Sequence, residues 1–169
     1  TCALPIFPPL AVTNVTATDV GTNRPYLATA NTTSAASAAN TGGAVTVSWT
    51  VPSTSNAATS YDITTTPSTY TANVAAPATT YTFQGLASAT AYTFTITPKN
   101  SFGNGITTTS GSATATTVPQ TMAAPTAANG TNSEIVTFTA PANGGKAISS
   151  YTITDSAATV VTGVTSSPY

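Results

Sequence analysis

The stretch that decides the fold is TAYTFTIT at residues 90–97, in which Tyr92, Phe94 and Ile96 alternate with threonines and one alanine. Apolar residues at every second position form one face of a β-strand, because successive side chains of a strand point to opposite sides. The pattern therefore predicts a strand with one buried face and one hydroxyl-bearing face. No stretch of useful length shows the 3.6-residue period of an amphipathic helix.

The same period of two recurs along the chain. It is clear in residues 45–50, 61–64 and 81–84, weaker in residues 15–17, and poorly amphipathic in residues 106–118. Turn-forming residues separate these runs, as in the Pro/Ser/Asn segment 52–58 and the Gly-containing segment 99–105. Short strands at regular spacing, separated by turns, predict an all-β sandwich or barrel.

Composition excludes several classes of function. Only 4% of the 169 residues are charged, whereas about 25% is usual, and 41 are threonine. Three scattered cations cannot form the basic stripe of a nucleic-acid binder. Histidine is absent and Cys2 is the only cysteine, so we expect no metal or haem site, no cofactor and no disulfide scaffold. We also expect no membrane insertion, since no run of 18 apolar residues occurs.

An internal repeat divides the chain. Trp49-Thr50-Val51-Pro52 matches Phe138-Thr139-Ala140-Pro141, and residues 60–64 match residues 150–154. The first unit spans about residues 9–118, and residues 119–124 form a Pro-containing linker. Residues 125–169 contain only the first half of the pattern, and Tyr169 falls about where Tyr81 does.

These residues carry a family resemblance. The Pro-rich entry before residues 15–18, the Trp49 strand, and Gly85-Leu86 followed by residues 90–94 make the chain similar to tandem fibronectin type III domains of the bacterial and phage kind. Residues 141–145 followed by 148–151 are also typical of those repeats. The resemblance implies an all-β, immunoglobulin-like (fibronectin type III) sandwich followed by a partial second sandwich. It also implies a tyrosine corner at Tyr92. The expected structural residues are Trp49, Tyr61, Leu86, Tyr92, Phe94, Phe138 and Tyr151.

The sequence departs from that family in two places. Residues 19–43 form an enlarged first loop, with a low-complexity insertion of about a dozen residues. The second unit lacks its last three strands, so Val136, Phe138, Tyr151 and Ile153 are expected to face an open side. We expect this unit to be marginal when alone, because so short a segment buries little surface.

Both ends of the chain suggest a fragment of a longer protein. Residues 1–6 resemble the translation of a sequencing-library adapter, although an ordinary natural segment is the alternative. We therefore treat residues 1–8 as a non-native or disordered leader, which makes Cys2 uninformative.

Few residues are candidates for a site. No catalytic residue is expected, because nothing brings Asp62 and Asp155 together and no histidine activates a Ser or Thr. Asn14, Asn31 and Asn129 open Asn-x-Ser/Thr triplets, which arise by chance in so Thr-rich a chain.

Two regions are candidate partner contacts. Arg24, Tyr26 and Leu27 in the enlarged loop either contact a glycan or protein, or cap the end of the sandwich. Phe102 lies at the tip of the loop 99–105, where some family members carry an integrin-binding tripeptide that is absent here.

The resemblance implies a non-enzymatic spacer or adhesion-type module of a larger secreted, cell-surface or phage-virion protein. Its partners would be neighbouring domains of the same chain, and the Pro-containing linker would limit bending between them. The alternatives are a glycan- or protein-binding module, predicting an exposed aromatic patch of Tyr26, Tyr70 or Phe102, and an accessory domain of a polysaccharide-degrading enzyme.

Overall fold

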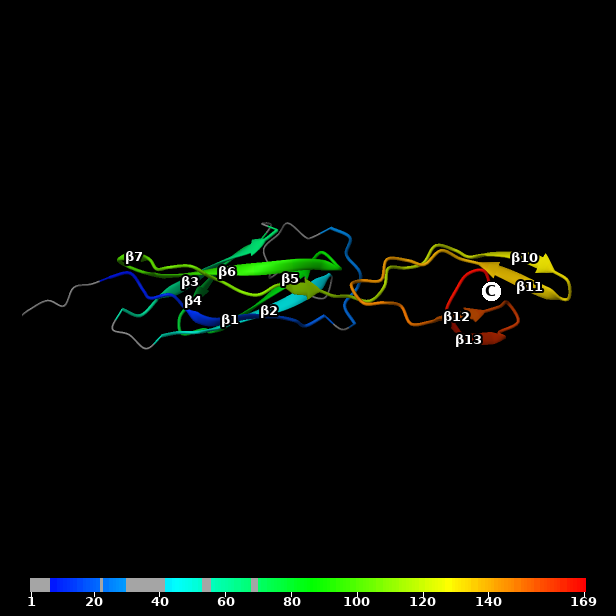
Figure 1. The fold of residues 1–169 in the computed structure, drawn as a ribbon, viewed down its shortest axis with the longest axis horizontal. Helices are drawn as coiled ribbons and strands as arrows, with labels where there is room; N and C mark the ends of the chain where they lie inside the picture. The colour runs from blue at the N-terminus through cyan, green and yellow to red at the C-terminus, as the bar shows by residue number, and fades with distance from the viewer. Residues whose placement is uncertain (1–6, 22, 30–41, 53–55, 68–69) are drawn as a thin grey trace, which may run out of the picture.

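The computed structural model describes residues 7–21, 23–29, 42–52, 56–67 and 70–169. Most of the proposed leader with Cys2, the low-complexity part of the enlarged loop and the triplet at Asn31 lie outside these residues. The described chain is a rod, with a two-sheet unit at one end and two small hairpins at the other (Figure 1). The described residues contain no helix, and hence none that is long and apolar enough to cross a membrane.

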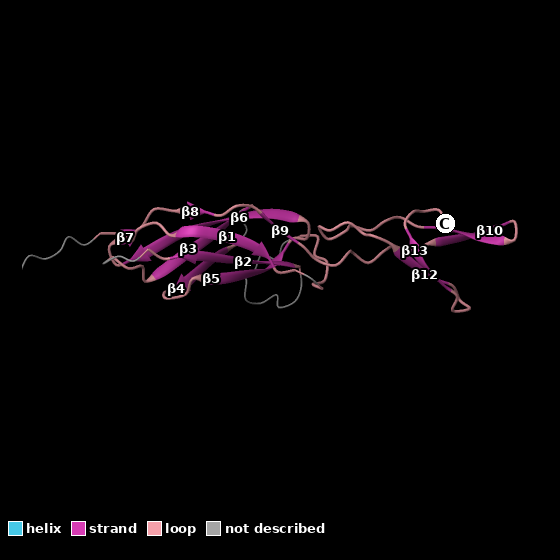
Figure 2. Cartoon of the chain, turned by 60° about the horizontal axis from the view of Figure 1, so that its bottom comes forward, coloured by secondary structure: helices cyan, strands magenta, loops and turns pink. Residues whose placement is uncertain are grey.

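The first unit is a β-sandwich, as predicted. One sheet has three antiparallel strands in the order β1 (Thr13–Asp19), β2 (Gly43–Thr50) and β5 (Thr80–Leu86). Val47 of β2 lies opposite Ala17 on one side and Tyr81 on the other. Figure 2 shows this sheet as one layer of the strand-rich end of the rod.

The second sheet is built around β6 (Thr90–Asn100), the stretch with the strongest alternation. One edge of β6 pairs with β3 (Ser60–Thr66), which in turn pairs with β4 (Thr71–Ala75). Three short strands pair along the other edge: β7 (Gly103–Asn104), β8 (Thr108–Thr109) and β9 (Ala113–Ala115).

The core lies between these two sheets. Most of its large side chains come from the alternating runs, and at most 4% of each of the following is exposed: Val45, Val47, Trp49, Tyr61, Ile63, Phe83, Leu86, Tyr92, Phe94 and Ile96. Aromatic rings pack in tilted pairs, with centroid distances of 5.1 Å for both Trp49–Tyr61 and Phe83–Phe94. The alternation in the sequence therefore located the buried face correctly.

A tyrosine anchors the crossover between β5 and β6. The Tyr92 hydroxyl accepts a hydrogen bond from the Ala87 N–H at 3.2 Å, and both residues are buried. Burial raises the pKa of Tyr92, although the hydrogen bond from Ala87 opposes the shift. This hydrogen bond has the form of the tyrosine corner that the family resemblance implied at Tyr92.

Hydroxyl groups pair across strands on the outer faces. Thr46 and Thr82 are 2.8 Å apart between their Oγ1 atoms, as are Thr16 Oγ1 and Ser48 Oγ, and either member of each pair is able to donate. The outward threonines of the alternating pattern therefore satisfy one another without charge.

Two expectations need correction. The single strand expected over residues 106–118 is divided into β8 and β9, because the Ser110 hydroxyl accepts the Phe94 N–H at 3.0 Å and interrupts the ladder. Tyr70, named as a candidate exposed aromatic residue, is only 3% exposed, and its hydroxyl donates to the Gly85 carbonyl at 2.7 Å. Tyr70 directly precedes β4, in which Ala72 and Val74 are the two positions that are not exposed.

Beyond residue 124 the chain forms two antiparallel hairpins. One pairs β10 (Thr126–Gly130) with β11 (Ser133–Thr137), and the other pairs β12 (Tyr151–Thr154) with β13 (Val160–Val164). We call residues 125–169 the second unit. Only Gly144 and Val164 are buried in it. The half-buried side chains of Val136, Phe138, Tyr151 and Ile153 lie around one cavity of this unit.

Candidate functional site

The carboxylates of Asp62 and Asp155 serve as local structural acceptors. Asp62 forms an ion pair with Lys99 and accepts a hydrogen bond from Asn73 Nδ2 at 2.6 Å, and these two partners hold its pKa below the usual value. In the second unit Asp155 accepts the N–H groups of Thr159 at 2.8 Å and Ala157 at 2.9 Å, which lowers its pKa. No group of three or more His, Cys, Asp or Glu side chains that could hold a metal ion occurs among the described residues.

The enlarged loop is fastened to the end of the sandwich. Arg24 Nε donates to the Gly42 carbonyl at 2.6 Å, and Leu27 and Ser88 are joined by two hydrogen bonds of 2.9 Å. Arg24, Tyr26 and Leu27 are all half-buried. These contacts fit the capping interpretation of the loop better than the partner-contact interpretation.

Phe102 lies at the opposite end of the unit and is 52% exposed. The Asn100 side chain accepts the Phe102 N–H at 2.9 Å and donates to the Phe7 carbonyl at 3.1 Å, so the entry segment and the loop lie side by side. Leu10 and Ile106, exposed by 54% and 73%, extend this apolar end. The candidate contact at Phe102 thus has exposed apolar neighbours that we did not single out from the sequence.

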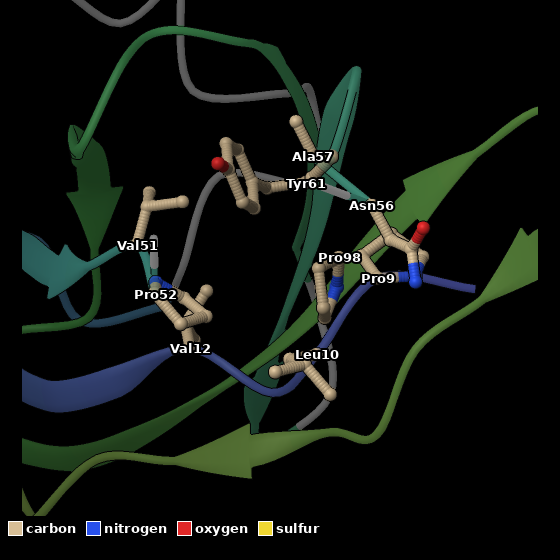
Figure 3. A pocket seen from close by; sticks show the side chains of 10 residues that line it. Pro9, Leu10, Val12, Val51, Pro52, Asn56, Ala57, Tyr61 and Pro98 are labelled. Carbon is tan, nitrogen blue, oxygen red and sulfur yellow. The ribbon is translucent and has the colours of Figure 1, made fainter. Parts of the chain in front are cut away.

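A small cavity lies beneath this end, between Pro9, Val51, Pro52, Tyr61 and Pro98 (Figure 3). Its volume is about 10 Å³, which is room for no more than one water molecule. Proline rings and aliphatic side chains line most of it. The cavity is therefore a packing gap at the entry of the chain and not a ligand site.

Backbone hydrogen bonds hold the junction between the two units. Residues 117–120, where the first unit passes into the linker, donate N–H groups to two sides: Val118 to the Arg24 carbonyl at 2.9 Å, Thr117 to the Gly144 carbonyl at 2.8 Å, and Gln120 to the Ala142 carbonyl at 2.9 Å. Thr116, which follows β9, donates its N–H to Asp19 Oδ1 at 3.0 Å. This segment is thereby bonded both to the first unit and to the second.

Glycine is required where the second unit meets this linker. Gly144 and Gly145 have φ values of 68° and 98°, which other residues rarely adopt. A Cβ atom on Gly144 would lie 2.4 Å from the Thr117 carbonyl oxygen and 2.5 Å from that of Val118. One on Gly145 would lie 3.2 Å from Ala89 Cα. Residues 144 and 145 can lie this close to the first unit only because glycine has no side chain.

The sequence did not point to this junction as a site. Residues 141–145 are predicted only as typical of the family's repeats, and the glycine pair in them is the signal that could have indicated a close backbone approach. Asp19 was noted only as the start of the enlarged loop, since its partner Thr116 is far away along the chain.

Comparison with known proteins gives the following matches. The model of the family described as "Fibronectin type III domain" matches residues 31–115. A search of curated proteins found no match. Among solved structures, a crystal structure of domains from titin is 20% identical, with a TM-score of 0.36, and the match covers 66% of this chain and 32% of that one. The crystal structure of chicken CNTN1 FN1–FN3 domains is 15% identical, with a TM-score of 0.37 and coverage of 73% and 41%. The chain spans less than half the length of each of these structures.

Proposed function

The chain belongs to the fibronectin type III family, and on that premise we propose that it is a non-catalytic spacer in which two such domains are held in a fixed row. Domains of this family are typically structural or adhesion modules of multidomain proteins and are generally non-catalytic. We propose residues 9–118 as the first domain, 119–124 as the linker and 125–169 as the first half of a second domain of the bacterial and phage kind. A secreted, cell-surface or virion protein would be the setting.

The observation that carries this proposal is the hydrogen bonding of residues 117–120, where the first unit passes into the linker. A flexible linker leaves its N–H groups to water and lets two units tumble separately. Here Thr117 and Val118 donate in opposite directions, to Gly144 and Arg24, so a change in the angle between the units would break at least one of these bonds. A spacer needs such a joint, because its function is to keep distance and direction constant.

Backbone ¹⁵N NMR relaxation tests the proposal. We expect the residues of both units in the full chain to report one anisotropic tumbling of a rod. The substitution Gly144→Ala places a methyl group against the carbonyl oxygens of Thr117 and Val118. The second unit should then tumble independently of the first and faster than it does in the unsubstituted chain. Gly163→Ala is the matched control, because Gly163 also has a positive φ of 75° but has no atom within 4 Å of the added Cβ. Independent tumbling of the two units in the unsubstituted chain would refute the rigid joint.

One observation favours a second candidate function, that of a protein- or glycan-binding module. The exposed apolar end formed by Phe7, Leu10, Phe102 and Ile106 is a surface that a partner would cover. Of the aromatic patch expected for such a module, Tyr70 is buried and Tyr26 is half-buried, which leaves Phe102. Loss of binding to a glycan or protein array on Phe102→Ser substitution, with an unchanged melting temperature, would support this function. An accessory role beside a polysaccharide-degrading enzyme would differ from the spacer role only in which domains flank this chain.

A further inference from the structure

Asparagine directly precedes glycine at three places in the chain: Asn104-Gly105, Asn129-Gly130 and Asn143-Gly144. Asparagine is one of the chemically labile residues of proteins, because the peptide nitrogen that follows it is able to attack its side-chain amide. A following glycine favours this attack, since its backbone reaches conformations that other residues rarely adopt. The three pairs share the same local chemistry, so their surroundings decide which of them reacts.

Two of the three pairs are held in strands or by a hydrogen bond. Asn104 belongs to β7, and the N–H of Gly105 donates to the Pro98 carbonyl at 2.8 Å. Asn129 and Gly130 are the last two residues of β10 and are paired with β11. To attack, the glycine nitrogen has to turn toward the asparagine side chain. This turn would break the hydrogen bond in the first pair and the strand pairing in the second.

The third pair lies in the turn by which the second unit meets the first. Asn143 is exposed, whereas Gly144 is buried and has a φ of 68°. The Gly144 N–H donates to no acceptor within the part of the chain that the structure describes. Its nitrogen is therefore able to approach the Asn143 side chain without giving up a hydrogen bond.

The side-chain carbonyl of Asn143 is already polarised for such an attack. Its Oδ1 accepts the Gly145 N–H at 2.9 Å. An intermediate formed at Cγ places negative charge on this oxygen, and a backbone N–H directed at the oxygen stabilises that charge. Water reaches the site, because Asn143 and Lys146 line an open hollow of about 230 Å³ at the junction. Asn143 thus combines an available nucleophile, a polarised carbonyl and access to water.

Both neighbours of Asn143 hold the junction. The Ala142 carbonyl accepts the Gln120 N–H at 2.9 Å, and the Gly144 carbonyl accepts the Thr117 N–H at 2.8 Å. The backbone of Asn143 sets the spacing between these two acceptors. An isoaspartyl residue continues the chain through its side-chain carbon and so adds a methylene group to that backbone. The two acceptors then no longer fit their two donors at the same time.

We propose that Asn143 is a site of spontaneous deamidation and that its isoaspartyl product releases the joint between the two units. The Gly144 nitrogen gives its proton to hydroxide and bonds to Asn143 Cγ. The Cγ–Nδ2 bond then breaks, and the amide nitrogen takes a proton from water and leaves as ammonia. Water opens the resulting succinimide: attack at the main-chain carbonyl gives isoaspartate, and attack at Cγ gives aspartate. The release rests on the rigid joint proposed above, whereas the reaction itself does not.

Peptide mapping by mass spectrometry tests the reaction. The full chain is incubated at mildly alkaline pH, and fragmentation assigns the conversion of amide to carboxylate to Asn104, Asn129 or Asn143. We expect Asn143 to react about tenfold faster than either of the others, which must first give up backbone hydrogen bonding. Incubation in urea should bring the three rates together, because unfolding removes that protection. Equal rates in the folded chain, or an unchanged difference in urea, would overturn the proposal.

Backbone ¹⁵N relaxation of the incubated chain tests the release. Chains with isoaspartate at residue 143, separated by ion exchange, should show independent tumbling of the second unit. Asn143→Gln is the control that keeps an amide, because its longer side chain would have to close a larger ring. Asn143→Asp adds the same charge without the methylene group and should keep the single tumbling of a rod.

The outcomes of the two experiments are distinguishable. An isoaspartyl chain that still tumbles as one rod, or an Asn143→Asp chain that tumbles as two units, would overturn the release. Two independent units before incubation would refute the rigid joint and its release together. In that case the reaction at Asn143 would still be decided by the rates from mass spectrometry.

Discussion

The carboxylate of Asp19 binds both the N–H and the hydroxyl of Thr116, 97 residues further along the chain. Asp19 ends β1 and Thr116 follows β9, so this contact joins the first strand of the sandwich to the start of the linker. The Thr116 hydroxyl also lies 3.0 Å from the Gly21 carbonyl. The end of the first unit is thereby closed at the point where the second unit attaches.

Replacing Asp19 should therefore destabilise the first unit. In Asp19→Ala the partly buried donors of Thr116 and the N–H of Gly21 lose an ionised acceptor, which should lower the free energy of unfolding by about 2 kcal/mol. Urea unfolding followed by Trp49 fluorescence measures the change. Asp155→Ala is the control, since its partners lie in an exposed turn of the second unit, and its effect on this transition should be much smaller. Equal losses for the two variants would contradict the role assigned to Asp19.

Removing the Tyr92 hydroxyl should cost stability as well. Tyr92→Phe leaves the buried Ala87 N–H without its acceptor, so we expect a loss of about 1–3 kcal/mol. Tyr81→Phe removes a hydroxyl from a half-buried side chain and should change stability far less. Thermal and urea unfolding of the two variants give the comparison. If both cost the same, the hydroxyl at the corner would not anchor the crossover.

Stability should fall above pH 10, and Tyr70 should contribute to the fall. Burial, aided by the nearby Tyr92, raises the pKa of Tyr70 from 10.0 to about 12. Between these values the unfolded chain has lost the Tyr70 proton while the folded chain keeps it, so folding becomes less favourable as pH rises. One such group gives a slope of about 1.4 kcal/mol per pH unit. Urea unfolding between pH 9 and pH 12 should show a steeper decline for the unsubstituted chain than for Tyr70→Phe. Parallel declines would show that Tyr70 ionises alike in both states.

Salt should have little effect on the melting temperature. The ion pair described between side chains, Lys99–Asp62, is about one-third exposed at each member, 35% and 34%, and such pairs contribute little. Between about 20 mM and 500 mM sodium chloride we expect a shift of less than about 2 °C. Differential scanning calorimetry measures it, with Asp62→Asn as the comparison. A large shift of the melting temperature in the unsubstituted chain that is absent in Asp62→Asn would show that the Lys99–Asp62 ion pair contributes more to stability than we expect.

Local patterns were sufficient to predict the sandwich. The alternation around Phe94 identified the core. The second domain that the Pro52–Pro141 correspondence indicates stays a prediction. The junction was not predictable in the same way. Its bonds run from backbone groups of Thr117 and Val118 to carbonyls distant in sequence, and backbone groups carry no residue-specific signal.

Tyr70 shows that a weak alternation is easily passed over. Tyr70, Ala72 and Val74 alternate with Thr71 and Asn73, so the sequence does carry a period-two signal for burial at this position. Its place inside the sandwich depends on the Gly85 carbonyl, which the β5–β6 crossover brings to its hydroxyl. Ser110 is similar, because its interruption of the strand depends on which residue of β6 it meets.

The paired hydroxyls on the outer faces have a consequence for recognition. In Thr16–Ser48, Thr46–Thr82 and Thr95–Thr109 either member is able to donate, so each pair has two proton arrangements. At these three pairs the surface presents no fixed order of donors and acceptors, because each pair can reverse its direction. A partner that contacts them therefore meets groups whose polarity adapts to it, in contrast to the fixed donors and acceptor of Lys99, Asn73 and Asp62.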